Sequence, residues 1–235
     1  MNVQTYIQSH PQLAELFSEI PNEELKFIQI NRYAPNQLLI QRGSQDTNLF
    51  IILYGICDVL NELETGINIC NYRIAPFDVI GFTEIITDTA PRIASVISRT
   101  PVTAAVIPRE AIQKWFGTYP AFTKKLTFSI VDRLHKSIIT MAECKSYSLR
   151  TNLISYLMHT YELYRKTYPD TYSGAVKINE SRQMMSEFLG VDVRSINRII
   201  ESLKSEELLA VIRGKIHIHP VQYNALIAAK YEATR

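Results

Sequence analysis

The sequence predicts an α+β protein with an N-terminal antiparallel β-roll or jelly roll, a long helix and a C-terminal winged helix-turn-helix. Three observations predict it. Short runs rich in Ile, Val and Tyr recur up to Pro108, the helical period then returns, and two short helices precede a basic hairpin. We expect the roll at 1–119, the long helix at 120–145 and the winged helix-turn-helix at 146–235.

The predicted strands lie between Ile28 and Pro108, where turn residues separate the apolar runs. Repeated short strands at this spacing are typical of an antiparallel barrel or jelly roll. The segment Leu49 to Leu60 is predicted as two strands, or as one strand bent at Gly55, because it is β-branched with a central glycine. The turns are expected at Pro35-Asn36, Gly43-Ser44, Gly55, Glu64-Thr65-Gly66, Pro76-Phe77-Asp78 and Pro91.

The long helix is predicted from Pro120 to about Lys145. Its apolar residues recur at intervals of four and then three, which indicates one stripe. Such a stripe either packs within the chain or pairs with the same helix of a second subunit along residues 120–143, and we expect the second. The stripe consists of Phe122, Leu126, Ile130, Leu134, Ile138 and Met141.

Composition sets bounds on the class of protein. Hydrophobic residues make up 46% of the chain and charged residues 20%, as in ordinary globular proteins. No apolar run reaches the roughly 20 residues of a membrane span, and the N-terminus has no secretory pattern, so we expect a cytoplasmic protein. The three cysteines are scattered, which favours reduced core thiols over a metal centre.

Charge is distributed unevenly along the chain. Residues 1–144 carry 12 Lys and Arg against 14 Asp and Glu, whereas residues 145–235 carry 13 against 9. A basic C-terminal part is compatible with a polyanionic partner, although a difference of this size decides nothing alone.

Two short helices near the C-terminus are joined by a tight turn. Ser181 is a suitable cap for the first helix, Gly190 ends it, and Asp192 is a cap for the second. The buried face of the first helix is expected to hold Met185, Phe188 and Leu189. That of the second is expected to hold Ile196, Ile199, Ile200 and Leu203.

The opposite face of the second helix is polar. Arg194, Asn197, Arg198 and Glu201 lie at i, i+3, i+4 and i+7. This arrangement is typical of a helix-turn-helix, in which arginine pairs with guanine and asparagine with adenine. A hairpin turning at Arg213-Gly214-Lys215 forms a wing whose basic tip, with Lys215, would reach a phosphate. The alternative is a solvated helix pair without DNA contact.

At this point the chain resembles the bacterial Crp–Fnr family of transcription regulators over nearly its whole length. The resemblance depends on the order and spacing of several motifs. These are Ser181-Arg182-Gln183, Gly190 followed by Ile196-Asn197-Arg198, Ile80-Gly81 with Glu84 and Pro91-Arg92-Ile93-Ala94, and Arg133-Leu134.

The resemblance implies double-stranded DNA as partner, a homodimer, and RNA polymerase as a further candidate partner. It makes Arg182 a phosphate contact, with Gln183 beside it, and it places Val193, Arg194 and Arg198 toward base edges. Asp192 and Ser195 would lie near the DNA backbone. Many relatives carry an acidic residue where this chain has Arg194, so the operator should differ from the usual one.

The resemblance also implies a sensor pocket in the roll. In relatives that bind cyclic nucleotides, a Gly-Glu pair and an Arg-Ser/Thr or Arg-Ala pair contact ribose and phosphate. Here Gly81 and Arg92 remain, but Phe82 replaces the glutamate and Ile93 follows the arginine. The candidate effector pocket consists of Gly81, Phe82, Glu84, Arg92, Ile93 and, on the long helix, Ser137.

We therefore expect either a small effector other than a cyclic nucleotide, or a dimer that is competent without one. If residues 81–84 are extended, Glu84 should point away from the Phe82 side. Arg92 has an alternative role as the partner of Glu84 or Asp88 in an internal ion pair.

An enzyme is not expected. Residues 28–108 contain no histidine, and neither a phosphate-binding glycine loop nor a nucleophile elbow is present. No cofactor or metal is predicted. The alternative to a DNA-binding regulator is a regulatory ligand-binding module whose C-terminal helices bind a protein.

Overall fold

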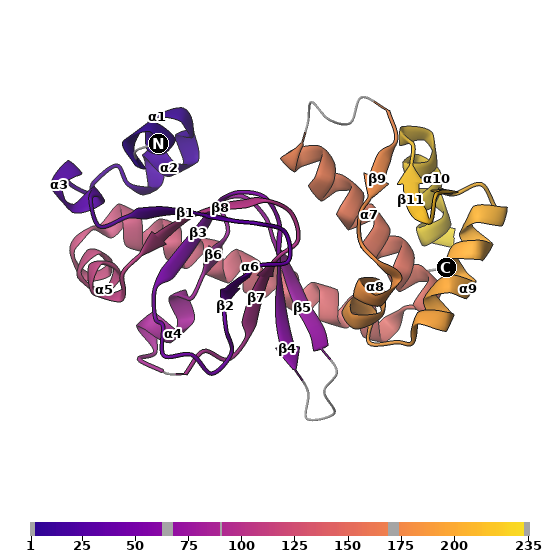
Figure 1. The fold of residues 1–235 in the computed structure, drawn as a ribbon, viewed down its shortest axis with the longest axis horizontal. Coiled ribbons are helices and arrows are strands. Elements are labelled where there is room, and N and C mark those ends of the chain that lie inside the picture. The colour runs from indigo at the N-terminus through magenta and orange to yellow at the C-terminus, as the bar shows by residue number, and fades with distance from the viewer. Residues whose placement is uncertain (1–2, 63–67, 90, 169–173, 233–235) are drawn as a thin grey trace. The chain divides into compact units, whose positions relative to one another are not determined.

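The computed structural model describes residues 3–62, 68–89, 91–168 and 174–232 (Figure 1). Its contacts divide the chain into two compact units, Met1–Gly66 with Cys70–Ser137, and Ile67–Ile69 with Ile138–Arg235. Helix α6 belongs to both units, so the division into 1–119, 120–145 and 146–235 stays a prediction. The turn expected at Glu64-Thr65-Gly66 and most of the loop expected at 167–175 lie outside the described residues.

The first unit contains the expected antiparallel roll, built from two four-stranded sheets (Figure 1). One sheet has the order β1-β8-β3-β6 and the other β2-β7-β4-β5. The strands are β1 (Gln29–Tyr33), β2 (Leu38–Ile40), β3 (Leu49–Tyr54), β4 (Cys57–Glu62), β5 (Asn68–Ile74), β6 (Val79–Ile80), β7 (Ser95–Ser98) and β8 (Val102–Ile107).

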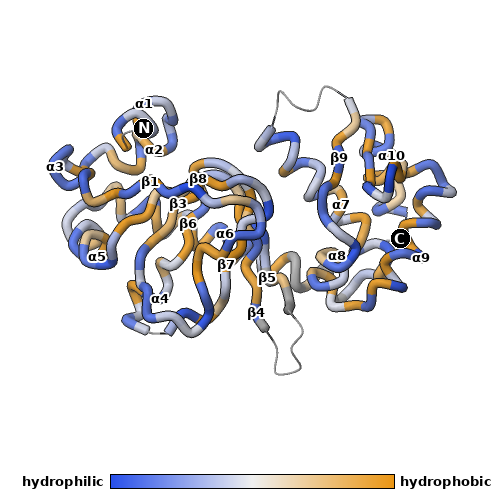
Figure 2. The backbone as a smooth tube through the Cα atoms, in the orientation of Figure 1, coloured by the Kyte–Doolittle hydropathy of each residue, from blue (hydrophilic) through white to orange (hydrophobic). Residues whose placement is uncertain are grey.

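Strand β3 has apolar residues on both of its faces because both are covered. Leu49, Ile51 and Leu53 belong to a core shared with the surrounding helices. Phe50 and Ile52 belong to a second core between the two sheets. This explains the continuous apolar run of the sequence, where a half-exposed strand would alternate, and it appears as an unbroken orange stretch in Figure 2.

Gly55 separates β3 from β4, so the choice between two strands and one bent strand is settled in favour of two. Its φ is +91°, and a Cβ there would lie 2.2 Å from the carbonyl oxygen of Pro101. No other residue type fits this turn without displacing the backbone, because only glycine adopts such a conformation at low cost.

Helices close the first core. They are α1 (Val3–Ser9), α2 (Pro11–Leu16), α3 (Asn22–Leu25), α4 (Phe82–Ile86) and α5 (Arg109–Thr118). Trp115 on α5 is fully buried and meets Phe17 and Phe122 at ring distances of 6.3 and 5.7 Å.

The long helix α6 (Pro120–Ser146) forms where expected, but its apolar stripe divides in two. Phe122 and Leu126 are 0% and 1% exposed in the core of the first unit, whereas Leu134 and Ile138 are 59% and 57% exposed. An interval of four residues advances about 40° around a helix, so a stripe at that interval drifts off its initial face. The expectation of a single stripe was therefore wrong, and the side chain of Met141 lies outside the described residues.

The second unit has a three-stranded sheet, order β10-β11-β9, surrounded by helices. Strand β9 and the last helix, α10, were not expected from the sequence. The elements are α7 (Leu149–Thr167), β9 (Val176–Ile178), α8 (Arg182–Leu189), α9 (Val193–Ser205), β10 (Ala210–Ile212), β11 (Lys215–Ile218) and α10 (Pro220–Glu232).

Within the described residues, no helix combines the length and hydropathy that a membrane span requires. Cys57 and Cys70 are buried free thiols, and burial raises the pKa of the Cys57 thiol to about 12. The side chain of Cys144 is not described.

Side-chain hydrogen bonds of Glu24 connect helix α3 to α5. Its carboxylate accepts hydrogen bonds from Lys114 Nζ at 2.9 Å, Trp115 Nε1 at 2.5 Å and Tyr119 Oη at 2.9 Å. The bond from Lys114, with those from Trp115 and Tyr119, lowers the pKa of Glu24 below its usual 4.5 although desolvation opposes the shift.

We predict that Glu24→Gln destabilises the fold at neutral pH and that the difference from wild type fades in acid. A depressed folded-state pKa contributes stability that is fully present above the unfolded value of 4.5 and is lost as pH falls through the folded value. Urea unfolding at pH 7 and at decreasing pH below 4.5 measures this. Glu23→Gln, at an exposed neighbouring position, is the control, and equal losses for both variants would contradict the prediction.

Candidate nucleic-acid interface and sensor site

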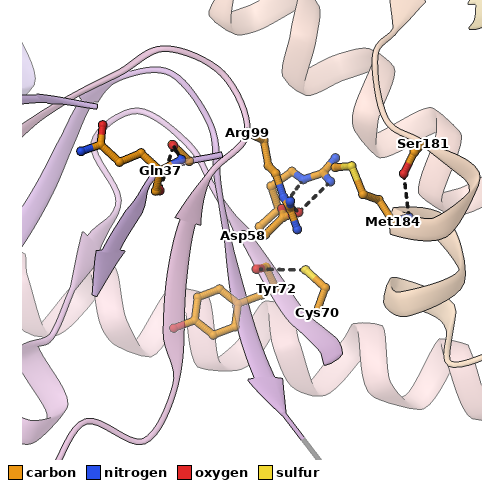
Figure 3. A network of polar contacts seen from close by, with 9 residues as sticks. Gln37, Asp58, Cys70, Tyr72, Arg99, Ser181 and Met184 are labelled. Carbon is orange, nitrogen blue, oxygen red and sulfur yellow. Dashed lines mark hydrogen bonds and ion pairs between the residues drawn. The ribbon is translucent and has the colours of Figure 1, made fainter. Parts of the chain in front are cut away.

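The expected helix-turn-helix is present, with each helix capped as the sequence indicated. Ser181 Oγ accepts from Met184 N at 3.1 Å, and Asp192 Oδ1 accepts from Ser195 N at 2.9 Å (Figure 3 shows the first). Gly190 ends α8 at a φ of +66°, a left-handed conformation that favours glycine. The hydroxyl of Ser186 donates to the carbonyl of Val191, which closes the turn.

Helix α9 is amphipathic, and its two faces are those predicted. Ile196, Ile199, Ile200 and Leu203 are buried. Arg194, Asn197 and Arg198 are exposed, and hydrophobic and hydrophilic stretches alternate along the helix in Figure 2. In α8 the buried residues are Met185 and Ser186, so the expectation for Phe188 and Leu189 was too strong, since both are only partly buried.

The charged side chains of this unit fall into two groups. Several are held by partners: Arg150 by Glu206 at 2.6 Å, Lys204 by Glu201 at 3.2 Å, and Lys215 by the carbonyl oxygen of Asn179 at 2.8 Å. In contrast, the described contacts include no hydrogen bond or ion pair made by the side chains of Arg194, Arg198 and Arg213. Their charges are therefore available to an external anion.

The remaining predicted contact residues differ in how available they are. Gln183 Nε2 donates to Glu187 Oε1 at 3.1 Å. Asp192 and Ser195 are joined to each other, the hydroxyl donating to Oδ2 at 2.7 Å, and this bond lowers the pKa of Asp192. Both residues are thereby used in capping α9, and Val193 is partly buried.

Arg182 lies at the first position of α8 and is partly buried. Burial lowers the pKa of its guanidinium, and the nearby charge of Glu201 partly opposes that shift. A guanidinium in this state still carries its charge at neutral pH.

The predicted wing is a hairpin of β10 and β11. Its loop has two residues, Arg213 and Gly214, with φ of +49° and +76°, the signature of a type I′ turn. Lys215 opens β11 and pairs with Ile212, so the exposed tip is Arg213. The sequence signal was the Arg-Gly dipeptide between two apolar runs.

In the roll, the expected orientation of Glu84 was wrong. Residues 82–86 form the helix α4, capped by Gly81 at a φ of +84°, so the alternation of an extended strand does not apply. The helical turn brings Glu84 to Arg92, and their charged atoms are 3.4 Å apart. The internal ion pair considered for Arg92 is thus made with Glu84, while Asp88 pairs with Arg109.

Arg92 is 3% exposed, and its guanidinium donates to three backbone carbonyls. Nε donates to Asp46 O at 2.6 Å, Nη1 to Gly81 O at 3.2 Å, and Nη2 to Asn48 O. Together with the contact to Glu84, these bonds direct the guanidinium at the protein's own oxygens. As they stand, these residues do not fit a cyclic phosphate.

The other proposed pocket residues differ in their surroundings and exposure. Phe82 is 7% exposed and packs in the hydrophobic core, with its ring 5.4 Å from that of Phe116. Ile93 is 66% exposed, and Ser137 is partly buried on α6. The described residues contain no cluster of three or more His, Cys, Asp or Glu that could hold a metal ion.

Arg133 attaches α6 to the roll. Its guanidinium donates to the carbonyl oxygen of Val79 and lies 5.3 Å from the centre of the Tyr72 ring. Burial is the main cause of the raised pKa of Tyr72.

A buried ion network on β4 and β5 was not expected from the sequence. Asp58, which is 1% exposed, accepts from Arg73 Nε at 2.8 Å and from Arg99 Nε at 2.7 Å (Figure 3). Burial alone would raise the pKa of Asp58, but the two guanidinium groups outweigh it and the pKa is lowered. Nothing in the spacing of positions 58, 73 and 99 indicated that they would meet.

Comparison with known proteins agrees with this architecture. Residues 30–119 match the cyclic nucleotide-binding domain family. A search of curated protein sequences finds no match.

Solved structures similar to the chain include Crp/Fnr regulators. One, from Eubacterium rectale and assigned to the Crp/Fnr family of transcriptional regulators, gives a TM-score of 0.73 at 15% identity, covering 92% of this chain and 97% of its own. A CRP-family transcriptional regulator from Thermus thermophilus gives 0.70 at 15% identity, covering 87% and 97%. The c-di-GMP-responsive global regulator CLP of Xanthomonas campestris gives 0.67 at 16% identity, covering 83% and 96%.

At these identities the neighbours establish the fold, and the resemblance inferred from the sequence is confirmed at that level. Residues 30–119 are thus similar to the cyclic nucleotide-binding domain family, and the chain has the fold of Crp/Fnr-family transcription regulators.

Proposed function

We propose that the protein is a transcription regulator that binds specific DNA sequences as a homodimer, with α9 as its recognition helix. The observation that carries the proposal is the set of unpaired arginines, Arg194 and Arg198 on α9 and Arg213 at the wing tip. Other charged side chains of the same unit, such as Arg150 and Lys204, have carboxylate partners, whereas the charges of these three arginines are available to DNA. Residues 1–119 would act as the sensor, 120–145 as the dimer helix and 146–235 as the DNA-binding part.

In this proposal Arg194 and Arg198 donate to guanine in the major groove, and Asn197 pairs with adenine. Arg182 and Arg213 contact phosphates on either side, with Gln183 beside the first. Asp192 and Ser195 set the entry angle of α9 through its cap, near the DNA backbone. Val193 faces base edges beside Arg194. Lys215 supports the wing by its bond to Asn179. Recognition is by positioned hydrogen bonds and involves no catalysis.

The homodimer proposal uses the exposed apolar side of α6. Phe128, Val131, Leu134, Ile138 and Ile139 are between 46% and 73% exposed. Their positions fall within about 140° of the helix circumference, at 100° per residue. An apolar face of this kind on a long helix is typical of a helix–helix interface. A two-fold dimer would present two copies of α9 to half-sites about one helical turn apart.

Selection from a random-sequence DNA pool tests the function. We expect wild-type protein to enrich a near-palindromic site and Arg198→Ala to lose that enrichment, since each bidentate contact contributes about 1–3 kcal/mol to base discrimination. Lys204→Ala is the matched control, because Lys204 lies on the same helix but is paired with Glu201. If wild type enriches no sequence at low or moderate salt, the proposal fails, and the alternative of a protein-binding module stands.

The dimer is tested separately by analytical ultracentrifugation. We predict that Leu134→Glu shifts the protein from dimer to monomer, because a charge would be buried in the proposed apolar interface. Lys136→Glu, which lies outside this apolar face, about 130° around the helix from its middle, and is 72% exposed at its side chain, should leave the dimer intact. A wild-type monomer at micromolar concentration would overturn the homodimer.

A further inference from the structure

Around Arg92, which we call the tip of the roll, hydrogen bonds within the chain hold the loop 43–48 against the turn at Gly81. The backbone of Arg92 bonds to Gly43 N at 2.8 Å and Ser44 O at 3.0 Å, and its guanidinium reaches Asp46, Asn48 and Gly81. One residue thereby joins the segment 43–48 to the segment before α4. Arg92 therefore connects the two segments through hydrogen bonds.

The carboxylate of Glu84 supplies a negative charge beside Arg92. Glu84 is 9% exposed, and its Oε2 lies 3.4 Å from Arg92 Nη1. A buried guanidinium requires a counter-charge and acceptors, because an isolated buried ion is strongly destabilising. Glu84 and three carbonyls supply both.

The turn that carries Gly81 lies directly against the guanidinium of Arg92. A Cβ at Gly81 would lie 2.5 Å from Arg92 Nη1 and 2.7 Å from Asn48 O, closer than real Cβ contacts. A phosphate placed against the guanidinium would have to displace the carbonyls or Glu84. Displaced carbonyls would lose partners, and Glu84 would face a like charge.

We propose that Glu84 is a built-in anion that takes the place of a ligand phosphate at Arg92, so that the roll is closed to cyclic nucleotides and other small phosphate-bearing effectors. The roll tip holds its conformation without ligand. Arg133, bonded to the carbonyl of Val79, attaches α6 to the roll in the same state. If the proposed function holds, the protein binds DNA without such an effector. Only this consequence rests on the proposed function; the closure of the roll does not.

The test uses full-length protein and thermal unfolding at constant ionic strength. The probes are cyclic AMP, cyclic GMP and inorganic phosphate, with sodium chloride as the ionic control. Wild type should show a change in Tm below about 1 °C for each probe at millimolar concentration, since no binding means no linkage to stability. A saturable rise in the Tm with any of the three probes, present in wild type and kept in the variant Arg194→Ala/Arg198→Ala that lacks the α9 arginines, would overturn the proposal; a rise that this variant loses is assigned to α9 and not to the roll.

The variant Glu84→Ala should expose the cation. We expect its Tm to fall by roughly 5 °C or more, because the buried charge of Arg92 loses its partner. Inorganic phosphate or cyclic nucleotide should then raise that Tm by about 3 °C at tenfold excess over Kd, a gain that wild type lacks. Asp88→Asn is the control, since it removes one carboxylate whose side chain is 83% exposed and does not contact Arg92.

Two further outcomes are decisive. If Glu84→Ala does not fold, Glu84→Gln, which keeps the shape and removes the charge, takes its place with the same expectation. If the foldable Glu84 variant gains no anion-dependent stability, Glu84 is not standing in for a phosphate and the proposal fails. These results are independent of DNA binding, so a failure here is distinguishable from a failure of the proposed function.

Discussion

The buried charge of Arg92 is the constraint on which the tip of the roll depends. A guanidinium that is 3% exposed must have oxygens around it, and the chain brings them from residues 46, 48, 81 and 84. The positive φ of Gly81 and the helical turn of residues 82–86 place the Gly81 carbonyl and the Glu84 carboxylate against this guanidinium. The same contacts direct the arginine inward, although the matching domain family is named for nucleotide binding.

Helix α6 shows how one element serves two surfaces. Its first turns supply Phe122 and Leu126 to the core of the first unit, and further along it exposes Val131 and Leu134. The change of face follows from helical geometry, because four-residue steps do not return to the same side. A single helix can therefore hold the roll through Arg133 and still present an apolar face outward.

Local signals in the sequence predicted most of the fold and the proposed DNA-reading surface. The caps at Ser181 and Asp192, the glycine at 190 and the faces of α9 depend on residues within a few positions of one another, so spacing alone identifies them. The roll was predicted in the same way from its turns. What the sequence did not reveal depends on contacts between distant residues. Glu24 and Trp115 are 91 residues apart, and Asp58 and Arg99 are 41 apart. The direction of Glu84 was mistaken because a helical turn was taken for a strand.

The proposed function depends on contacts between the unpaired arginines of α9 and guanines in the major groove. Methylation interference on the selected DNA site tests it most directly, because dimethyl sulfate modifies guanine N7, the atom that a bidentate arginine contacts. We expect interference at guanines in two clusters about one helical turn apart, and loss of one guanine per cluster from the pattern in Arg194→Ala. Binding that tolerates methylation at every guanine would contradict it.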